Sequence, residues 1–168
     1  MKNIKIIILL SLLFSVANAQ TLENKKIPDF PVFDVYDNRH SILDLLKDLP
    51  DKGYLILNFT SMFCKPCKKE IPELMNISDK FKNRIKIIYI YSEINNKEVI
   101  NDALKLGIKN NELINVCTDL FSTIKKEQNV KSVPYTILIS KNGDVLNRIE
   151  GYTEKNIKII YSLLEATK

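Results

Sequence analysis

Two near-continuous apolar runs, at residues 54–60 (YLILNFT) and 85–92 (IKIIYIYS), constrain the fold of this 168-residue chain most strongly. A strand that is covered on both faces reads as an unbroken apolar run, whereas a strand with one solvated face alternates apolar and polar residues. Between the two runs, residues 67–81 carry apolar side chains at helical spacing. Strands that alternate with helices predict an α/β domain whose central sheet is covered by helices on both faces.

Weaker signals extend this alternation along the rest of the chain. The Asn142-Gly143 pair between two apolar runs is a strong hairpin signal. We therefore expect strands at residues 30–37, 113–117, 135–140 and 145–150, and helices at residues 41–49, 97–106, 119–128 and 154–165. Asp119 is expected to cap the helix that it begins. This order predicts a mostly parallel sheet with an antiparallel edge at the terminal hairpin.

The first 19 residues have the pattern of a secretory signal peptide. Two lysines give a positive start, residues 6–17 are apolar, and Ala17-Asn18-Ala19 is a small-residue cleavage site. The run is shorter than the about 20 apolar residues that a membrane-spanning helix needs. We expect residues 1–19 to be removed and residues 20–168 to form one domain in the periplasm or another extracytoplasmic space. An uncleaved anchor is the alternative.

The charge of the chain argues against one class of partner. The formal net charge is +5, and it becomes +3 when the two lysines of the expected signal peptide are subtracted. Arginine occurs three times, and the aromatic residues do not interleave with it as they do in nucleic-acid-binding surfaces. We therefore expect no nucleic acid partner.

The chain has three cysteines, Cys64, Cys67 and Cys117, and the first two form a C-x-x-C motif. Export would place them in an oxidising compartment. A small domain stapled by disulfides would have an even and dense set of cysteines. A purely structural disulfide across so short a loop would also add little stability. The pair therefore calls for a chemical explanation.

The C-x-x-C motif directly follows the apolar run at residues 54–60 and opens a helix, for which Pro66 is a favourable start. A helix N-terminus carries roughly half a positive charge, which stabilises a thiolate. Nearby lysines add to this charge: Lys65, Lys68 and Lys69. We expect a pKa for Cys64 below the about 8.5 of free cysteine, whereas Cys67 should be shielded and react second.

A C-x-x-C motif can also be half of a zinc site, which needs four ligands. The remaining donors are Cys117 and His40. We expect His40 to be a surface residue beside a turn and Cys117 to be an inert core thiol. Neither a metal nor another cofactor is therefore expected, and a metal carrier remains an alternative.

Three stretches of the chain point to a known family. Residues 57–74 read LNFTSMFCKPCKKEIPEL, residues 27–46 read IPDFPVFDVYDNRHSILDLL, and residues 129–157 read NVKSVPYTILISKNGDVLNRIEGYTEKNI. These stretches resemble the thioredoxin superfamily, specifically its TlpA/ResA-like exported thiol–disulfide oxidoreductases. The resemblance implies a thioredoxin-like fold with a central mixed sheet, an N-terminal extension and an inserted αβ unit.

The resemblance also implies roles for single residues. Cys64 corresponds to the attacking cysteine and Cys67 to the resolving one, and the two form the redox-active disulfide. Pro134 corresponds to a cis-proline that faces this disulfide and turns the Val133 backbone toward an extended substrate chain. Glu70 corresponds to a glutamate that moves protons near the pair. A solvated Glu70, paired with a neighbouring lysine, is the alternative.

The chain departs from the family pattern beside the motif. Thr60 and Phe63 stand where the family usually has tryptophans, and the chain has no tryptophan. Phe63 can still give a partner an apolar contact. Asn58 stands where cytosolic thioredoxins carry a buried aspartate, so proton transfer would move to Glu70.

The expected function is therefore exchange of a dithiol and a disulfide with protein substrates, by default as a reductase. The resemblance implies roles in cell redox homeostasis and cytochrome c biogenesis, with a membrane or periplasmic thiol as electron donor. We expect the chain to be a monomer. A non-catalytic binding module with a redox-sensitive cysteine pair is the alternative function. The sequence does not resolve the reduction potential, for which thiol–disulfide proteins span about −270 to −120 mV.

Overall fold

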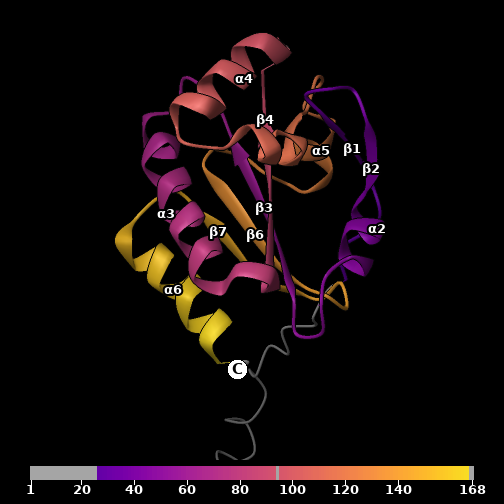
Figure 1. The fold of residues 1–168 in the computed structure, drawn as a ribbon, viewed down its shortest axis with the longest axis vertical. Coiled ribbons are helices and arrows are strands. Elements are labelled where there is room, and N and C mark those ends of the chain that lie inside the picture. The colour runs from indigo at the N-terminus through magenta and orange to yellow at the C-terminus, as the bar shows by residue number, and fades with distance from the viewer. Residues whose placement is uncertain (1–25, 94, 167–168) are drawn as a thin grey trace, which may run out of the picture.

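The computed structural model describes residues 26–93 and 95–166. A seven-stranded sheet with the strand order β2-β1-β5-β4-β3-β6-β7 runs through its centre (Figure 1). The strands are β1 (Pro31–Asp34), β2 (Arg39–Ser41), β3 (Tyr54–Thr60), β4 (Ile85–Tyr91), β5 (Val116–Thr118), β6 (Tyr135–Ser140) and β7 (Val145–Glu150). The α-helices are α2 (Ile42–Lys47), α3 (Lys65–Phe81), α4 (Asn96–Lys105), α5 (Thr123–Glu127) and α6 (Glu154–Glu165), and the 3₁₀ helices are η1 (Lys82–Arg84) and η2 (Asn110–Asn115).

The sheet is mixed, with a parallel centre and antiparallel flanks. Strand β4 pairs parallel with β3 and with β5, whereas the other strand pairs are antiparallel. The expectation of a mostly parallel sheet was wrong, because an apolar run reveals that a strand is covered on both faces but not which way it runs. The antiparallel edge at the terminal hairpin was confirmed.

Two apolar layers cover the sheet and explain the apolar run in β3. Ile56 points into the layer under α3 and α6, whereas its neighbours Leu55 and Leu57 point into the layer under α2 and α5. In Figure 1, α3 and α6 lie together on one side of the sheet and α2 lies on the other. Each fully buried aliphatic side chain contributes roughly 1.5–3 kcal/mol relative to an exposed one. Both faces of β3 are therefore needed for the fold.

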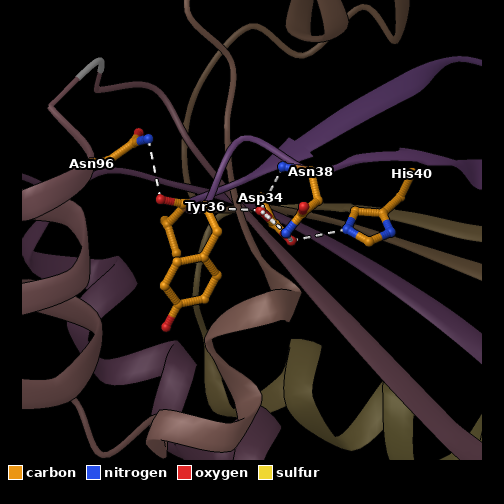
Figure 2. Close-up of polar contacts among 6 residues, drawn as sticks. Asp34, Tyr36, Asn38, His40 and Asn96 are labelled. Atoms are coloured by element: carbon orange, nitrogen blue, oxygen red, sulfur yellow. Dashed lines mark hydrogen bonds and ion pairs between the residues drawn. The ribbon is translucent and has the colours of Figure 1, made fainter.

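Asp34 ends the first strand earlier than expected and organises the hairpin of β1 and β2. Its buried carboxylate accepts hydrogen bonds from the backbone N–H groups of Tyr36 (2.9 Å) and Asn38 (3.0 Å) and from the Asn38 side chain (3.0 Å to Oδ2) (Figure 2). These bonds close a turn inside the expected strand at residues 30–37. The chain then reverses into β2, a strand that the sequence did not predict.

His40 lies in β2 and contacts Asp34 with its imidazole. The His40 Nε2 atom is 3.0 Å from Asp34 Oδ2, and the His40 side chain is 24% exposed. His40 was expected to be a surface residue beside a turn; it does follow a turn, but its ring is half-buried, because the hairpin directs it toward a buried carboxylate (Figure 2).

The segment before β6 also differs from the expectation. Residues 110–115 form η2, and the strand expected at residues 113–117 begins only at Val116. The helix expected at residues 119–128 is the shorter α5. Asp119 nevertheless supplies acceptors for the start of α5, since its carboxylate accepts the N–H groups of Ile124 (3.2 Å) and Lys125 (2.9 Å).

The expected signal peptide falls within residues 1–25, outside the described residues. Within residues 26–93 and 95–166, no helix is long and apolar enough to cross a membrane.

Candidate active site

A disulfide joins Cys64 and Cys67 where β3 leads into α3. The two Cα atoms are 5.2 Å apart, and the S–S distance is 2.00 Å. Cys64 is the N-cap of α3, and its Sγ atom accepts a hydrogen bond from the Cys67 N–H (3.1 Å). The helix begins at Lys65, two residues before its expected start, because Pro66 is favoured in a first turn.

The two cysteines differ in exposure. Cys67 is 1% exposed and lies in the first turn of α3, facing the core. Cys64 is half-buried and precedes the helix. A partner can therefore approach Cys64 more readily than Cys67, and the order in which they react stays a prediction.

Positive charge surrounds the start of α3. The first turn of the helix contains no acidic residue, and Lys65, Lys68 and Lys69 are exposed around it. Lys68 also forms an ion pair with Asp102 of α4, with 3.6 Å between Nζ and Oδ1. Together with the helix N-terminus, these charges favour a thiolate on Cys64.

Pro134 lies at the same edge of the sheet as the disulfide. The antiparallel register pairs Phe59 with Tyr135, so the start of β6 lies beside the end of β3. The Val133–Pro134 peptide bond is cis. Within the described residues, the backbone of Val133 makes no hydrogen bond, so it is available to pair with an extended chain.

Phe63 directly precedes Cys64 and is 82% exposed. An exposed aromatic ring beside a reactive cysteine is an apolar contact surface for a partner. Thr60, at the other family tryptophan position, is buried.

Glu70 is buried on the same side of α3 as Cys67 and does not lie in solvent. It is 1% exposed, its Oε2 atom accepts a hydrogen bond from Asn58 Nδ2 (2.8 Å), and its Oε1 atom accepts one from Thr136 Oγ1 (3.2 Å). The alternative of a solvated Glu70 was wrong, because Glu70 faces the core on the same side of α3 as Cys67. The position i+3 places the two side chains next to each other on the helix.

Burial raises the pKa of Glu70 from 4.5 to about 6, although the hydrogen bonds from Asn58 and Thr136 lower it in part. A carboxyl group with this pKa can hold or release a proton in weakly acidic to neutral solution. Asn58 also donates to Thr136 Oγ1 (3.0 Å), so the three side chains form one buried network.

The sequence did not single out Thr136. The signal was present in the pairing of β3 with β6, since Asn58 lies directly opposite Thr136. The sequence alone does not give the register of β3 against β6, so the contact could be identified only from the structure.

Cys117 lies away from the disulfide, in β5. It is buried and unpaired, and burial, together with the Asp34 charge, raises the pKa of its thiol. Within residues 26–93 and 95–166, no three side chains of His, Cys, Asp or Glu are grouped so that they could hold a metal ion.

Known proteins resemble this chain in sequence and in fold. The thioredoxin-like family model matches residues 52–145. The thiol-disulfide oxidoreductase ResA of Bacillus thuringiensis (strain Al Hakam) is 32% identical over 132 residues, which cover 78% of this chain and 71% of that protein. ResA of Bacillus subtilis (strain 168) is 27% identical over 96% of this chain and 90% of that protein.

Solved structures agree on the fold. A Chlorobium tepidum protein assigned as thiol:disulfide interchange protein DsbE superimposes with a TM-score of 0.72 at 18% identity, over 85% of this chain and 95% of that chain. A half-buried cysteine at a helix start, its buried disulfide partner and the sequence match agree on one chemistry. The chain belongs to the thioredoxin-like family and is a ResA-related thiol–disulfide oxidoreductase.

Proposed function

We propose that this protein is exported and reduces disulfides in other exported proteins, with Cys64 as the attacking residue and Cys67 as the resolving one. The observation that carries the proposal is the difference between the two cysteines. Cys64 is accessible at the electropositive start of α3, whereas Cys67 is 1% exposed.

The proposed reaction begins from the dithiol form. The Cys64 thiolate attacks one sulfur of a substrate disulfide, and the other substrate sulfur leaves as a thiolate. Cys67 loses its proton and attacks Cys64 Sγ, which releases the second substrate thiolate and forms the Cys64–Cys67 disulfide. Two electrons have then passed to the substrate. A membrane or periplasmic dithiol donor returns them by the same steps in reverse.

Glu70 is the proposed proton acceptor for Cys67. Both residues lie on the buried side of α3, and the Glu70 pKa of about 6 keeps the carboxylate ionised at neutral pH. The carboxylate can then accept the thiol proton as Cys67 attacks.

Val133, Pro134 and Phe63 form the proposed substrate contact. The free backbone of Val133 can hydrogen-bond an extended substrate chain, as in strand addition. Phe63, which directly precedes Cys64 and is exposed, adds apolar area beside it.

The narrower part of the proposal concerns location and substrate. We propose that residues 1–19 direct export and are removed, and that the substrates include the cysteines of apocytochrome c. Both proposals rest on the signal-peptide pattern and on the resemblance to the TlpA/ResA-like group. Mass spectrometry of the protein from the periplasm should find Gln20 at the N-terminus.

Trapping of intermediates tests the two cysteine roles. Cys67→Ser should accumulate mixed disulfides on Cys64, because the resolving thiol is gone. Cys64→Ser is the matched control and should accumulate none. Adducts on Cys64→Ser but not on Cys67→Ser would reverse the roles. Reduction of insulin by the wild-type protein separates the enzyme from a non-catalytic binding module.

A further inference from the structure

Ser61 fixes the backbone that leads into Cys64. Its carbonyl oxygen accepts the Cys64 N–H (3.1 Å), and its hydroxyl oxygen accepts the Phe63 N–H (3.2 Å). The Ser61 hydroxyl in turn donates to Glu93 Oε1. Glu93 therefore holds the turn before the reactive cysteine through one serine.

The pairing of β3 with β4 fixes this contact. The parallel register brings Thr60 beside Tyr91, and the Ser92 N–H donates to the Thr60 carbonyl (3.2 Å), one step beyond the end of β4. The next residues, Ser61 and Glu93, then lie at the same edge of the sheet. The Ser61–Glu93 contact therefore lies just beyond the paired ends of β3 and β4, whose register brings the two residues together.

The second carboxylate oxygen of Glu93 makes no stabilising polar contact among the described residues. Glu93 Oε2 is buried and has no hydrogen-bond partner among the described residues, and no ion pair in that part of the chain includes Glu93. A buried acceptor without a donor carries a desolvation cost and calls for a functional explanation.

Glu93 brings negative charge to a positive site. The other charged groups around the start of α3 are Lys65, Lys68, Lys69, the buried Glu70, and Asp102 in its pair with Lys68. The lysines and the helix N-terminus stabilise a thiolate, whereas a carboxylate bonded to the turn before Cys64 destabilises it. A more stable thiolate favours the reduced protein and so raises the reduction potential. The charge of Glu93 acts in the opposite direction.

We propose that Glu93 is a positioning residue that holds the Cys64 turn through Ser61 and whose charge lowers the reduction potential of the Cys64–Cys67 pair. The proposal rests on the proposed function as a reductase, which needs a low potential. Its test does not depend on the direction of catalysis, because the acidity of Cys64 and the potential are equilibrium properties.

Two variants separate the charge of Glu93 from its hydrogen bond. Glu93→Gln keeps an oxygen that accepts from Ser61 but removes the charge. Glu93→Asp keeps the charge but is one methylene shorter and so weakens the bond. Glu98→Gln is the matched control, since it makes the same change at an exposed carboxylate in the first turn of α4.

The measurements are the pH dependence of Cys64 alkylation in the reduced protein and the equilibrium with glutathione. Glu93→Gln should raise the thiolate fraction below the Cys64 pKa by about threefold, the scale of one partly screened charge. The same threefold shift toward the dithiol form corresponds to a potential about 14 mV higher. Glu93→Asp should keep the wild-type potential but reduce insulin more slowly.

Two results would overturn the proposal. Glu93→Gln could leave the acidity of Cys64 and the potential unchanged, as Glu98→Gln should. Glu93→Gln and Glu93→Asp could also shift the potential alike, which would assign the effect to structure and not to charge. If the wild-type protein did not reduce insulin while Glu93→Gln still raised the potential, the proposed function would fail and the role of Glu93 would stand.

Discussion

At the scale of single residues, Cys64 and Cys67 differ in exposure although they are only three residues apart at the start of α3. Cys64 precedes the first turn of α3 and can be reached, whereas Cys67 lies within that turn and faces the core. Glu70 lies a further three residues along the same buried side. The helix therefore keeps Cys64 accessible and buries both Cys67 and Glu70, as the proposed roles of attacking sulfur, resolving sulfur and proton acceptor require.

Glu70 makes a prediction about stability, measured on the oxidised protein so that Cys64 and Cys67 do not titrate. Its pKa is raised by burial from 4.5 to about 6, so the folded state binds the proton more tightly than the unfolded state. Stability is therefore fully present below pH about 4.5 and is lost as the pH rises through 6. Glu70→Gln removes this loss.

The free energy of unfolding of Glu70→Gln, relative to wild type, should rise by up to about 2 kcal/mol between pH 4.5 and pH 7.5. Urea titrations at several pH values measure this difference. A difference that stayed constant with pH would show that Glu70 does not titrate in this range. Glu73→Gln, a carboxylate on the same helix for which burial is only partial, is a suitable control.

At the scale of secondary-structure elements, the hairpin of β1 and β2 depends on one buried carboxylate. Burial raises the pKa of Asp34, but hydrogen bonds from His40, Asn38 and Tyr36 lower it more, and the net pKa lies below 3.8. A carboxyl group with a depressed pKa stabilises the fold above the unfolded pKa, and this contribution is lost as the pH falls through the folded pKa.

Asp34→Ala should therefore lower the free energy of unfolding at pH 7 by about 3 kcal/mol, because it leaves several partly buried donors without an acceptor. The difference from wild type should shrink in acid. His40→Ala should cost less, since Asp34 keeps its bonds to Tyr36 and Asn38. Chemical unfolding at pH 7 and near pH 3 measures both variants. An equal loss for Asp34→Ala at both pH values would contradict the assignment of this carboxylate as ionised.

The same elements mark the limit of prediction from sequence. Periodicity gave the type and approximate place of the long elements, since β3, β4, α3 and α6 are each set by many residues. It missed β2 and overextended the first strand, because the turn between them depends on the side chain of Asp34. Periodicity also could not predict whether neighbouring strands run parallel or antiparallel, since a buried strand has the same apolar run in either direction.

Some residues of the candidate site could also be predicted from the sequence, whereas others could not. The C-x-x-C motif and the resemblance pointed to Cys64, Cys67, Pro134 and Glu70, which are residues of local motifs. Thr136 and Glu93 were missed, because their contacts arise from the register of β6 and β4 against β3. Residues that act through a neighbouring strand have no signature within a single stretch of sequence.

At the scale of the whole molecule, redox state and folding stability are linked by a thermodynamic cycle. The fold can shift the potential of the Cys64–Cys67 pair only by stabilising one redox form more than the other. A reductase has a low potential, so its disulfide form must be the more stable fold. A strong oxidant shows the reverse, because its reduced form is stabilised.

The oxidised protein should therefore unfold at a higher urea concentration than the protein in excess dithiol. The double variant Cys64→Ala, Cys67→Ala should unfold at the same concentration in both conditions, which excludes an effect of the dithiol on Cys117. Glu93→Gln should reduce the difference in unfolding free energy between the oxidised and reduced forms by RT times the logarithm of its shift in the glutathione equilibrium constant, since one cycle links the two measurements. A reduced form more stable than the oxidised one would make this protein an oxidant and would leave the order of attack by Cys64 and Cys67 intact.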